Sequence, residues 1–371
     1  MMNDNAMYEL LYRLNVQADY DLALLKQAFL QILNIEDSNK RNVMLGSLLT
    51  SLMAKTPKKE EIVVLLDVAF SLDDYEPRKR VRINQLKDKK IITMVGSGKK
   101  GIKTINISTA SAILASSMGA YVVKPGSYST SSVTGSADFM DIVGAEKNIS
   151  TQRSVEILEE CGFAFFNIED VIPNFDKVYG GNFYVPHILS FGLAGLVCPI
   201  KTDAVLYGLA HSNVELSLDV LREFDIKNAM VVSSTDDNIH FIDEMGIFGT
   251  TRLIGTKDGT KNGKLLIFNP LQELKLPSYT SRDIKQADNP IKNVQYIIDV
   301  LSGHGEGAHE DIVCINCANI LYLSGMVSSL KEGFLKSKEI IKSGLGLEQL
   351  IKYIKLTGGN NDKINKLVKV R

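Results

Sequence analysis

A glycine- and serine-rich stretch of the chain, VGSGKKGIKTINISTASAILASSMGAYVVKPGSYSTSSVTGS, has the residue types of a phosphate-binding site. Its first cluster, VGSGKKG, follows a short apolar run and precedes a helix-like segment. Glycines at such a turn let backbone N–H groups approach an anion, and the start of a helix favours negative charge. By itself the cluster is equally compatible with a plain strand-to-helix turn. Its candidate ligands are Gly96, Ser97, Gly98, Lys99, Lys100 and Gly101.

Two more polar clusters follow at the boundaries of neighbouring elements. NISTAS supplies side-chain donors and acceptors where a helix is expected to begin, although Ser and Thr there also serve as simple N-caps. KPGSYSTSSVTGSAD comes directly after the next apolar run. Because loops at the carboxyl ends of strands converge at one edge of an α/β sheet, the three clusters together favour a phosphate-rich ligand. The added candidates are Asn106, Ser108, Thr109, Ser111, Lys124, Gly126, Ser129, Ser131, Ser132 and Gly135.

An acidic pair, Asp243 and Glu244, lies much later in the sequence, in FIDEMGIFGTTRL. Adjacent carboxylates near a phosphate site suit Mg²⁺, which takes oxygen ligands and shares them with substrate phosphates. A neighbouring Asp and Glu are more often found on a protein surface without any such role. The pair becomes a candidate metal site only if the fold brings it to the glycine clusters.

The composition is that of a soluble protein without a polyanionic partner. The 371 residues include 42 basic and 43 acidic side chains, so the formal net charge is -1. This balance provides no general attraction to nucleic acid or anionic lipid. No apolar run approaches the roughly 20 residues of a membrane-spanning helix, and a secretory signal pattern is missing, so a cytoplasmic location is expected. The four cysteines, Cys161, Cys198, Cys314 and Cys317, are expected to be buried and structural.

Hydrophobic periodicity divides the chain into two parts. From Met7 to Leu72 apolar residues recur every three to four positions, which predicts several short amphipathic helices. From Lys90 onward, short apolar runs that suit strands alternate with helical patterns, and a helical tail follows. We therefore expect an α/β fold, with a small helical domain in residues 1–85 and a larger domain in residues 86–371. The larger domain is expected to hold a central mixed or parallel sheet with flanking helices.

The glycine-rich stretch closely resembles the anthranilate phosphoribosyltransferase family, whose motifs are GTGGDG, NISTAS, KHGN and SSxSGSAD. This chain has GSGKKG, NISTAS, KPGS and SSVTGSAD at the corresponding spacing. The similarity continues through the N-terminal helical segment, VEILEECGFAFF, the IDE element and DIVCINCANILYLSG. NISTAS together with the SGSAD-type motif is a specific signal, and the resemblance extends over most of the chain.

The resemblance implies a helical domain and an α/β domain with the active site between them, and a homodimer formed through the helical domain. It implies transfer of phosphoribose from phosphoribosyl pyrophosphate (PRPP) to a nitrogen of a small aromatic acceptor, with Mg²⁺ and hydrogen-bond donors stabilising the leaving pyrophosphate. Carried over by position, the candidate catalytic residues are Lys124, Asp243 and Glu244, and the candidate Mg²⁺ ligands are Ser108, Asp243 and Glu244. The resemblance implies that Gly96, Gly98, Gly101, Asn106, Ser108, Thr109 and Lys124 hold the phosphates. Together with candidates taken from this sequence alone, the expected substrate-binding residues are Gly96, Ser97, Gly98, Lys99, Lys100, Gly101, Asn106, Ser108, Thr109, Lys124, Gly126, Ser131, Ser132 and His187.

Two departures from the family motifs affect the phosphate side of the implied site. Lys99 and Lys100 stand where the family has Gly-Asp. Either they contact the pyrophosphate and take over charge neutralisation from Mg²⁺, or they form a solvated loop tip in a site that has lost its function. Pro125 replaces the His of KHGN, and its missing N–H changes the contacts available to that loop.

The acceptor side departs further. The family has an Arg after the GFAFF-like segment that engages the acceptor carboxylate, whereas this sequence has no arginine between Arg153 and Arg222. A carboxylate left unpaired during desolvation is costly, so we predict an aromatic or heteroaromatic acceptor other than anthranilate. His187, in YVPHIL, either contacts that acceptor or is a buried structural histidine.

Three other functions remain open on the sequence alone. One is a family member without catalysis that acts as a binding or partner subunit. A second is true anthranilate phosphoribosyltransferase of tryptophan biosynthesis. A third is phosphorolysis of a nucleoside, as in the related pyrimidine nucleoside phosphorylases, although the glycine pattern of this chain follows the transferases. Nucleic acid and membranes are not expected as partners.

Overall fold

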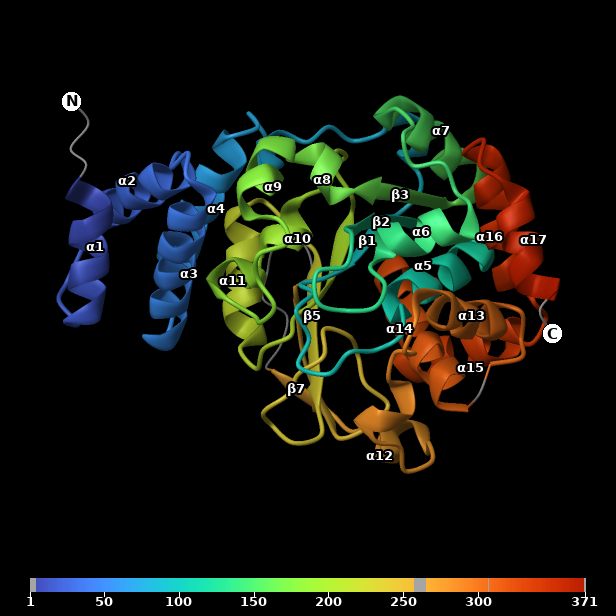
Figure 1. The fold of residues 1–371 in the computed structure, drawn as a ribbon. Coiled ribbons are helices and arrows are strands. Elements are labelled where there is room, and N and C mark those ends of the chain that lie inside the picture. The colour runs from blue at the N-terminus through green and yellow to red at the C-terminus, as the bar shows by residue number, and fades with distance from the viewer. Residues whose placement is uncertain (1–4, 257–264, 306, 370–371) are drawn as a thin grey trace.

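The computed structural model describes residues 5–256, 265–305 and 307–369. A central sheet of seven strands is flanked by helices, with the N-terminal helices at one end of the molecule and the C-terminal helices at the other (Figure 1). The predicted α/β class, with a helical N-terminal part, is confirmed. The boundary between residues 1–85 and 86–371 stays a prediction.

Among the described residues, four helices form the N-terminal part, and the starts of α2 and α3 follow from the sequence. The Asp21 side chain accepts a hydrogen bond from the Leu24 N–H group, and the Asp37 side chain does the same for Lys40. Such N-caps satisfy backbone donors that the first turn leaves without a partner. The helices are α1 (Asn5–Asn15), α2 (Leu22–Leu33), α3 (Ser38–Ala54) and α4 (Lys59–Ser71).

The sheet has the order β3-β2-β1-β4-β5-β6-β7. It is parallel from β3 to β5, and β6 and β7 add to it in antiparallel fashion, so the mixed sheet among the two predicted forms is the observed one. The chain runs from β1 to β2 on one side and later places β4 on the other side. Open α/β sheets bind ligands at such a switch point. The strands are β1 (Ile91–Gly96), β2 (Tyr121–Gly126), β3 (Phe163–Asn167), β4 (Ala204–Gly208), β5 (Ala229–Thr235), β6 (Thr250–Thr256) and β7 (Leu266–Phe268).

Helices follow the strands and then fill the C-terminal part. Those between the strands are α5 (Ile107–Ser117), α6 (Ser136–Val143), α7 (Thr151–Cys161), α8 (Ile168–Val171), α9 (Pro173–Tyr179), α10 (Leu193–Leu196) and α11 (Val214–Glu223). Those after the sheet are α12 (Pro270–Leu274), α13 (Pro290–Leu301), α14 (Gly307–Ser324), α15 (Leu330–Ile341), α16 (Leu345–Leu356) and α17 (Asn361–Lys369). Short 3₁₀ turns are η1 (Pro77–Lys79), η2 (Asn84–Leu86), η3 (Ile188–Phe191) and η4 (Ser281–Ile284).

Alternate residues of the central strands face two different cores. In β4, Leu206 packs into a core with α5, α13, α14 and α16, whereas Val205 faces a second core. The second core also contains side chains of α2, α3 and α4 and of the segment from α9 to α11. The α9–α11 segment therefore links the N-terminal helices to the sheet. All four cysteines are buried, as predicted, with Cys314 and Cys317 inside α14.

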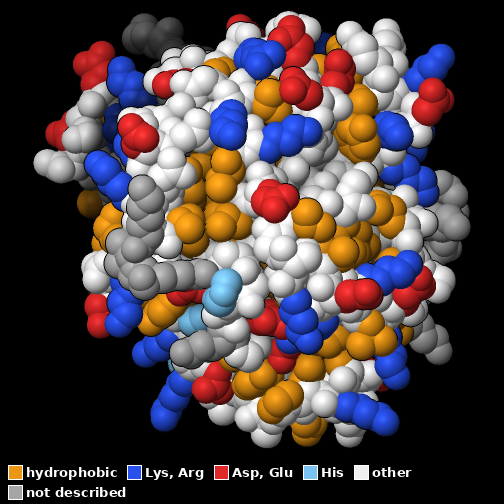
Figure 2. Space-filling model, turned by 90° about the vertical axis from the view of Figure 1, so that its right-hand side faces the viewer, with side chains coloured by type: hydrophobic (Ala, Val, Ile, Leu, Met, Phe, Trp, Pro, Cys, Tyr) orange, Lys and Arg blue, Asp and Glu red, His pale blue; other side chains and the backbone are white. Residues whose placement is uncertain are grey.

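The face formed by the C-terminal helices carries Lys and Arg interspersed with Asp and Glu, separated by small hydrophobic patches (Figure 2). This face lacks the broad basic stripe typical of nucleic-acid binding. Within the part of the chain that the structure describes, no helix is both long and apolar enough to cross a bilayer.

Candidate active site

A cavity of about 240 Å³ lies at the carboxyl ends of β1 and β2, and all three polar clusters of the sequence contribute to its walls. The acidic pair lines the same cavity, although it lies far along the chain. The structure thus brings together these four separate segments of the sequence. The predicted site residues that line the cavity are Gly96, Ser97, Gly98, Lys99, Lys100, Asn106, Ser108, Lys124, Gly126, Ser131, Ser132, Asp243 and Glu244, and Ser129 and Gly135 join them.

Three predicted substrate-binding residues lie outside the cavity lining. Gly101 donates its N–H to the Phe241 carbonyl at 2.9 Å, so its role is to join two loops. Thr109 is buried and donates to the Ser136 hydroxyl at 3.0 Å. Ser111, a further candidate of the NISTAS cluster, is also buried, and its hydroxyl donates to backbone carbonyls. These hydroxyls are satisfied within the fold and do not face a ligand.

His187 is the third predicted substrate-binding residue outside the cavity lining, and the structure supports its interpretation as a buried structural histidine. It is 4% exposed, and its Nδ1 accepts a hydrogen bond from the Leu189 N–H at 3.3 Å. Its Nε2 lies 2.9 Å from the hydroxyl of Tyr179, and it is Tyr179 that lines the cavity. Burial lowers the pKa of His187 well below the usual value. A neutral, buried imidazole that braces Tyr179 accounts for these contacts.

The glycine cluster is shaped by the close approach of Asp243. Gly96 and Gly208 are register partners at the ends of β1 and β4, and a Cβ atom on either would overlap with Asp243. Further along the loop, Gly98 has a φ of 66° and Lys99 a φ of 58°, so two successive residues are left-handed. This reversal turns the next side chain, that of Lys100, back toward the edge of the sheet.

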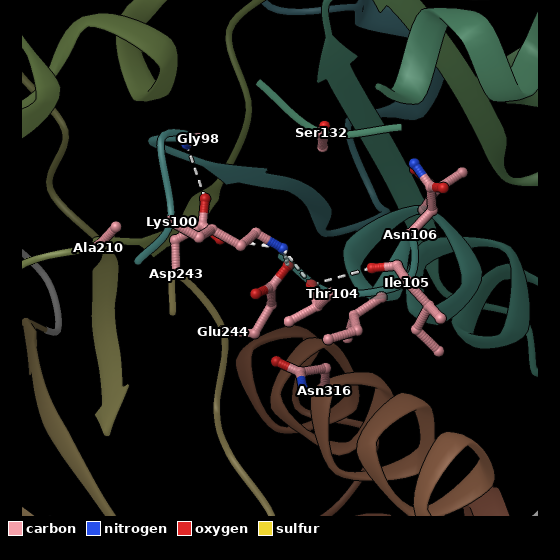
Figure 3. Close-up of polar contacts among 12 residues, drawn as sticks. Gly98, Lys100, Thr104, Ile105, Asn106, Ser132, Ala210, Asp243, Glu244 and Asn316 are labelled. Atoms are coloured by element: carbon pink, nitrogen blue, oxygen red, sulfur yellow. Dashed lines mark hydrogen bonds and ion pairs between the residues drawn. The ribbon is translucent and has the colours of Figure 1, made fainter. Parts of the chain in front are cut away.

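Lys100 forms ion pairs with both members of the acidic pair (Figure 3). Its Nζ lies 2.6 Å from Glu244 Oε1 and 3.3 Å from Asp243 Oδ1, and it donates to the Thr104 hydroxyl at 2.7 Å. The other Asp243 oxygen accepts the Gly98 N–H at 2.7 Å. Only 18% of the Lys100 side chain is exposed, so the interpretation of this lysine as a solvated loop tip is wrong.

The backbone of the acidic pair is fixed from two sides. The Ser234 hydroxyl of β5 donates to the Glu244 carbonyl at 2.7 Å. Asn316 of α14 accepts the Met245 N–H at 3.0 Å and donates to the Met245 carbonyl at 2.8 Å. Asp243 and Glu244 are therefore held in place before any ligand arrives, and they are 4% and 3% exposed.

Burial and neighbouring charges shift the pKa values of these groups. Burial and the charge of Asp243 raise the pKa of Glu244, while Lys100 opposes that rise. For Asp243 burial also acts upward, but Lys100 and hydrogen bonds bring its pKa below the usual value. Burial lowers the pKa of Lys124 to about 8, although the two carboxylates act in the opposite direction. Such clustered shifts are typical of functional sites.

The predicted Mg²⁺ ligands Ser108, Asp243 and Glu244 do not fit an ion held by both carboxylates. The donors are suitable oxygens, and Mg²⁺ binds such oxygens at about 2.1 Å in near-octahedral geometry. Here, however, the Lys100 ammonium already faces both carboxylates, and the Gly98 N–H takes one oxygen of Asp243. An ion bound by the pair would have to displace Lys100. No cluster of three or more His, Cys, Asp or Glu residues suited to a metal occurs among the described residues.

Side chains around the polar half of the cavity hold its loops together. Asn106 donates its amide to the Gly135 carbonyl at 3.2 Å, and its amide oxygen accepts from Asn293 at 3.0 Å. Lys124 donates to the Pro125 carbonyl at 2.8 Å. Lys103 also lines the cavity and donates to the Ser131 hydroxyl at 2.7 Å. No motif marks Lys103, which lies between the VGSGKKG and NISTAS clusters.

The opposite half of the cavity is aromatic and was not predicted. Tyr179 stacks between Phe175 and Phe183, with ring centroids 4.8 and 5.3 Å apart. Two acids, Glu169 and Asp176, line this half as well, and burial raises the pKa of Glu169 to about 7. The aromatic residues come from the α9 region, where no motif marks them, and only the spacing of NFDKVYGGNF on a short helix could have indicated a shared face.

Lys99 lies on this aromatic half. Its Nζ is 5.4 Å from the centroid of the Tyr179 ring, a separation that suits a cation–π contact. Lys99 and Lys100 are thus neighbours in sequence with different surroundings, one beside the aromatic rings and one on the acidic pair.

Comparison with known proteins places this chain in a family. The model of the glycosyl transferase family, a/b domain, matches residues 88–347. Anthranilate phosphoribosyltransferase of Methanocorpusculum labreanum is 30% identical over 333 residues, which cover 89% of this chain and 92% of that protein. The chain belongs to the anthranilate phosphoribosyltransferase family. The family suggested by the sequence motifs is therefore confirmed, and so, at the level of the family, is the predicted class of phosphoribosyltransferase.

Other members of the anthranilate phosphoribosyltransferase family agree with this assignment. The enzyme of Pseudoalteromonas translucida is 29% identical over 88% of this chain and 87% of its own length. A structure titled as the Saccharomyces cerevisiae enzyme in complex with PRPP and Mg has a TM-score of 0.77 at 20% identity, covering 96% of this chain and 99% of that one. The Thermus thermophilus enzyme has a TM-score of 0.74 at 21% identity, covering 94% and 99%. At these identities the solved structures establish the shared fold.

Proposed function

We propose that this chain transfers phosphoribose from PRPP to the amine nitrogen of an aromatic acceptor that carries a carboxylate, with anthranilate as the first candidate. The observation that carries this proposal is one cavity with two chemically different halves. One half offers the cations Lys103 and Lys124, and the other offers the aromatic surface of Tyr179. The relatives named as anthranilate phosphoribosyltransferases support the same pairing of substrates.

In this reaction the amine nitrogen forms a bond to ribose C1 as the bond from C1 to the pyrophosphate oxygen breaks, and the nitrogen releases one proton. Lys103 and Lys124 would bind the negative charge that develops on the leaving pyrophosphate. The aromatic rings would hold the acceptor against C1, so that proximity and orientation supply much of the catalysis. The boundary between the two halves of the cavity is the proposed position of C1.

Lys99 is the proposed partner of the acceptor carboxylate. The cavity lining contains no arginine among the described residues, as the sequence indicated. The prediction of an acceptor other than anthranilate assumed that no other cation replaces the missing arginine. Lys99, however, reaches the aromatic half of the cavity. Lysine serves as a point charge without the two-pronged geometry of arginine, so we expect weaker selection for the carboxylate.

A second candidate function is transfer to an acceptor without a carboxylate, as predicted from the sequence. Glu169 and Asp176 favour it, because two acids on the aromatic half repel a carboxylate and suit an acceptor with N–H donors. The raised pKa of Glu169 lessens this repulsion near neutral pH.

The test is a measurement of pyrophosphate release from PRPP in the presence of Mg²⁺ with a panel of aromatic amines. Anthranilate is expected to react, and Lys99→Ala is expected to raise its KM about tenfold while leaving the KM for PRPP unchanged. Lys331→Ala, on the distant helix α15, is the control. Faster turnover of amines without a carboxylate would favour the second candidate. PRPP binding without release with any acceptor would favour the partner-subunit alternative.

A further inference from the structure

We propose that the ammonium group of Lys100 is a built-in counter-ion of Asp243 and Glu244, and that this carboxylate pair therefore holds no metal ion in this protein. The inference deepens the proposed function, since it concerns how the PRPP site is charged, but its geometric basis is independent of the acceptor. It begins from the disagreement between the predicted Mg²⁺ ligands and the contacts that Asp243 and Glu244 make.

The position of Lys100 is built into the fold rather than chosen by a flexible side chain. Gly98 and Lys99 are both left-handed, which reverses the loop and directs Lys100 toward the acidic pair. The loop is anchored on each side of this lysine, by the Gly98 N–H on Asp243 and by the Gly101 N–H on the Phe241 carbonyl. The ammonium group therefore lies at the acidic pair whenever the loop keeps its conformation.

The acidic pair depends on this ammonium group. Asp243 Oδ1 and Glu244 Oε2 are buried and accept no hydrogen bond from the described residues, so the ion pairs with Lys100 are what offset their charge. Two buried carboxylates without a counter-ion would be strongly unfavourable. They would also be a good site for a hard divalent cation, which needs oxygen ligands and negative charge.

The charges in this part of the cavity explain why the Lys100 ammonium group and a divalent metal ion exclude each other. The pair carries at most two negative charges, and Lys100 together with the neighbouring Lys124 supplies two positive charges within the same cavity. A divalent ion entering beside both lysines would therefore find no net negative charge to attract it. Removal of the Lys100 charge would restore the attraction and free the space on both carboxylates.

The experiment uses Mn²⁺ alone as the probe, read by electron paramagnetic resonance of the free ion. The wild-type protein is expected to bind Mn²⁺ weakly, and Lys100→Ala is expected to gain a site with at least about tenfold higher affinity. Adding Glu244→Gln to Lys100→Ala should abolish that gain. Lys100→Arg, which keeps the charge, and Lys331→Ala, which removes an exposed cation on α15, should both behave like the wild type.

Two results would overturn the inference. One is Mn²⁺ binding to the wild type that matches Lys100→Ala and is lost in Glu244→Gln, and the other is no gain of Mn²⁺ binding in a folded Lys100→Ala protein. If Lys100→Ala does not fold, the wild-type titration against Glu244→Gln still decides. The Mn²⁺ titrations contain neither PRPP nor an acceptor. Their results can therefore be interpreted even if the protein lacks the proposed transferase activity.

A second readout connects the pair to the donor substrate. Calorimetry measures the affinity of each protein for PRPP with a divalent ion and again in EDTA. Removal of the divalent ion should weaken PRPP binding less in the wild type than in Lys100→Ala. The affinity of Lys100→Ala should recover only when the divalent ion is returned. An equal dependence of both proteins on the divalent ion would contradict the role assigned to Lys100.

Discussion

Lys99 holds a backbone conformation that suits glycine better than lysine, with a φ of 58°. A Cβ atom in the left-handed region costs roughly 1–2 kcal/mol. We expect Lys99→Gly to be more stable than Lys99→Ala by about 1 kcal/mol, because both lose the long side chain and only glycine avoids the Cβ conflict. Urea unfolding of the two variants measures the difference. Equal stabilities would mean that the loop has another conformation in solution.

Lys124 makes ligand binding depend on pH. Because burial lowers its pKa to about 8, the lysine is protonated at pH 7 and loses its proton as the pH rises through 8. Only the protonated form attracts an anion, so pyrophosphate affinity should fall above pH 8, by at most about tenfold per pH unit. The bound anion raises the pKa of Lys124, which shifts the end of the decline to higher pH.

Calorimetry with pyrophosphate from pH 7 to pH 10 checks this expectation, with Lys124→Met as the comparison. Ionisation of pyrophosphate itself affects both proteins equally, so the difference between them reports on Lys124. Parallel profiles for the two proteins would show that Lys124 does not titrate in this range.

At the scale of single residues, the sequence could not show which side chains contact one another. The motifs identified Lys100, Asp243 and Glu244 separately, but the ion pair between Lys100 and Glu244 joins residues 144 positions apart. That contact depends on two left-handed residues in the preceding turn, and nothing in GSGKKG specifies the φ of Lys99. His187 shows the same limit, because only the packing reveals that it faces Tyr179 rather than a ligand.

Among the elements, the ends of β1 and β4 are tightly constrained. Gly208 has no room for a Cβ because the Asp243 backbone carbonyl lies against it. We expect Gly208→Ala to destabilise the protein by about 3 kcal/mol or more, since the displaced group is backbone. By contrast, Gly46→Ala in α3 should stabilise it by about 0.5–1 kcal/mol, because nothing lies within 4 Å of the new Cβ and alanine favours a helix.

Thermal or urea unfolding of the two glycine variants makes this comparison with the same chemical change at two positions. A Gly208→Ala protein as stable as the wild type would mean that Asp243 does not approach β4 as described, and the geometry of the acidic pair would then need revision.

The elements themselves followed largely from the sequence. Alternation of apolar runs with helical patterns indicated the strands and helices around NISTAS, because strong periodicity and turn residues coincide there. The α9 region was harder, since NFDKVYGGNF forms one short helix and a loop whose aromatic side chains share a face only after folding. Accordingly the phosphate half of the cavity could be predicted, and the acceptor half could not.

For the whole molecule, the exposed side chains of the N-terminal helices bear on assembly. Tyr12 on α1 is 68% exposed and Val43 on α3 is 64% exposed, at the end of the molecule away from the C-terminal helices (Figure 1). Apolar side chains gathered on neighbouring helices suit an interface between copies. The homodimer implied by the family resemblance stays a prediction, and this surface is its expected interface.

Light scattering during size-exclusion chromatography tests the dimer. The wild type is expected to elute with twice the chain mass of 40.9 kDa, and Tyr12→Glu combined with Val43→Glu should shift it to the monomer. Leu335→Glu replaces another exposed apolar residue, 58% exposed on α15, and should leave the dimer intact. A monomeric wild type, or a dimer broken only by Leu335→Glu, would exclude the N-terminal interface.

The hydrogen bonds from Asn316 to Met245 have a consequence for biosynthesis. Helix α14 leaves the ribosome only after every described strand has been made, so the nascent chain carries Lys100, Asp243 and Glu244 as hydrated charges until that helix arrives. Translation products that end before α14 should consequently remain open to proteases, because the Met245 backbone next to the acidic pair lacks its two hydrogen bonds until that helix is present.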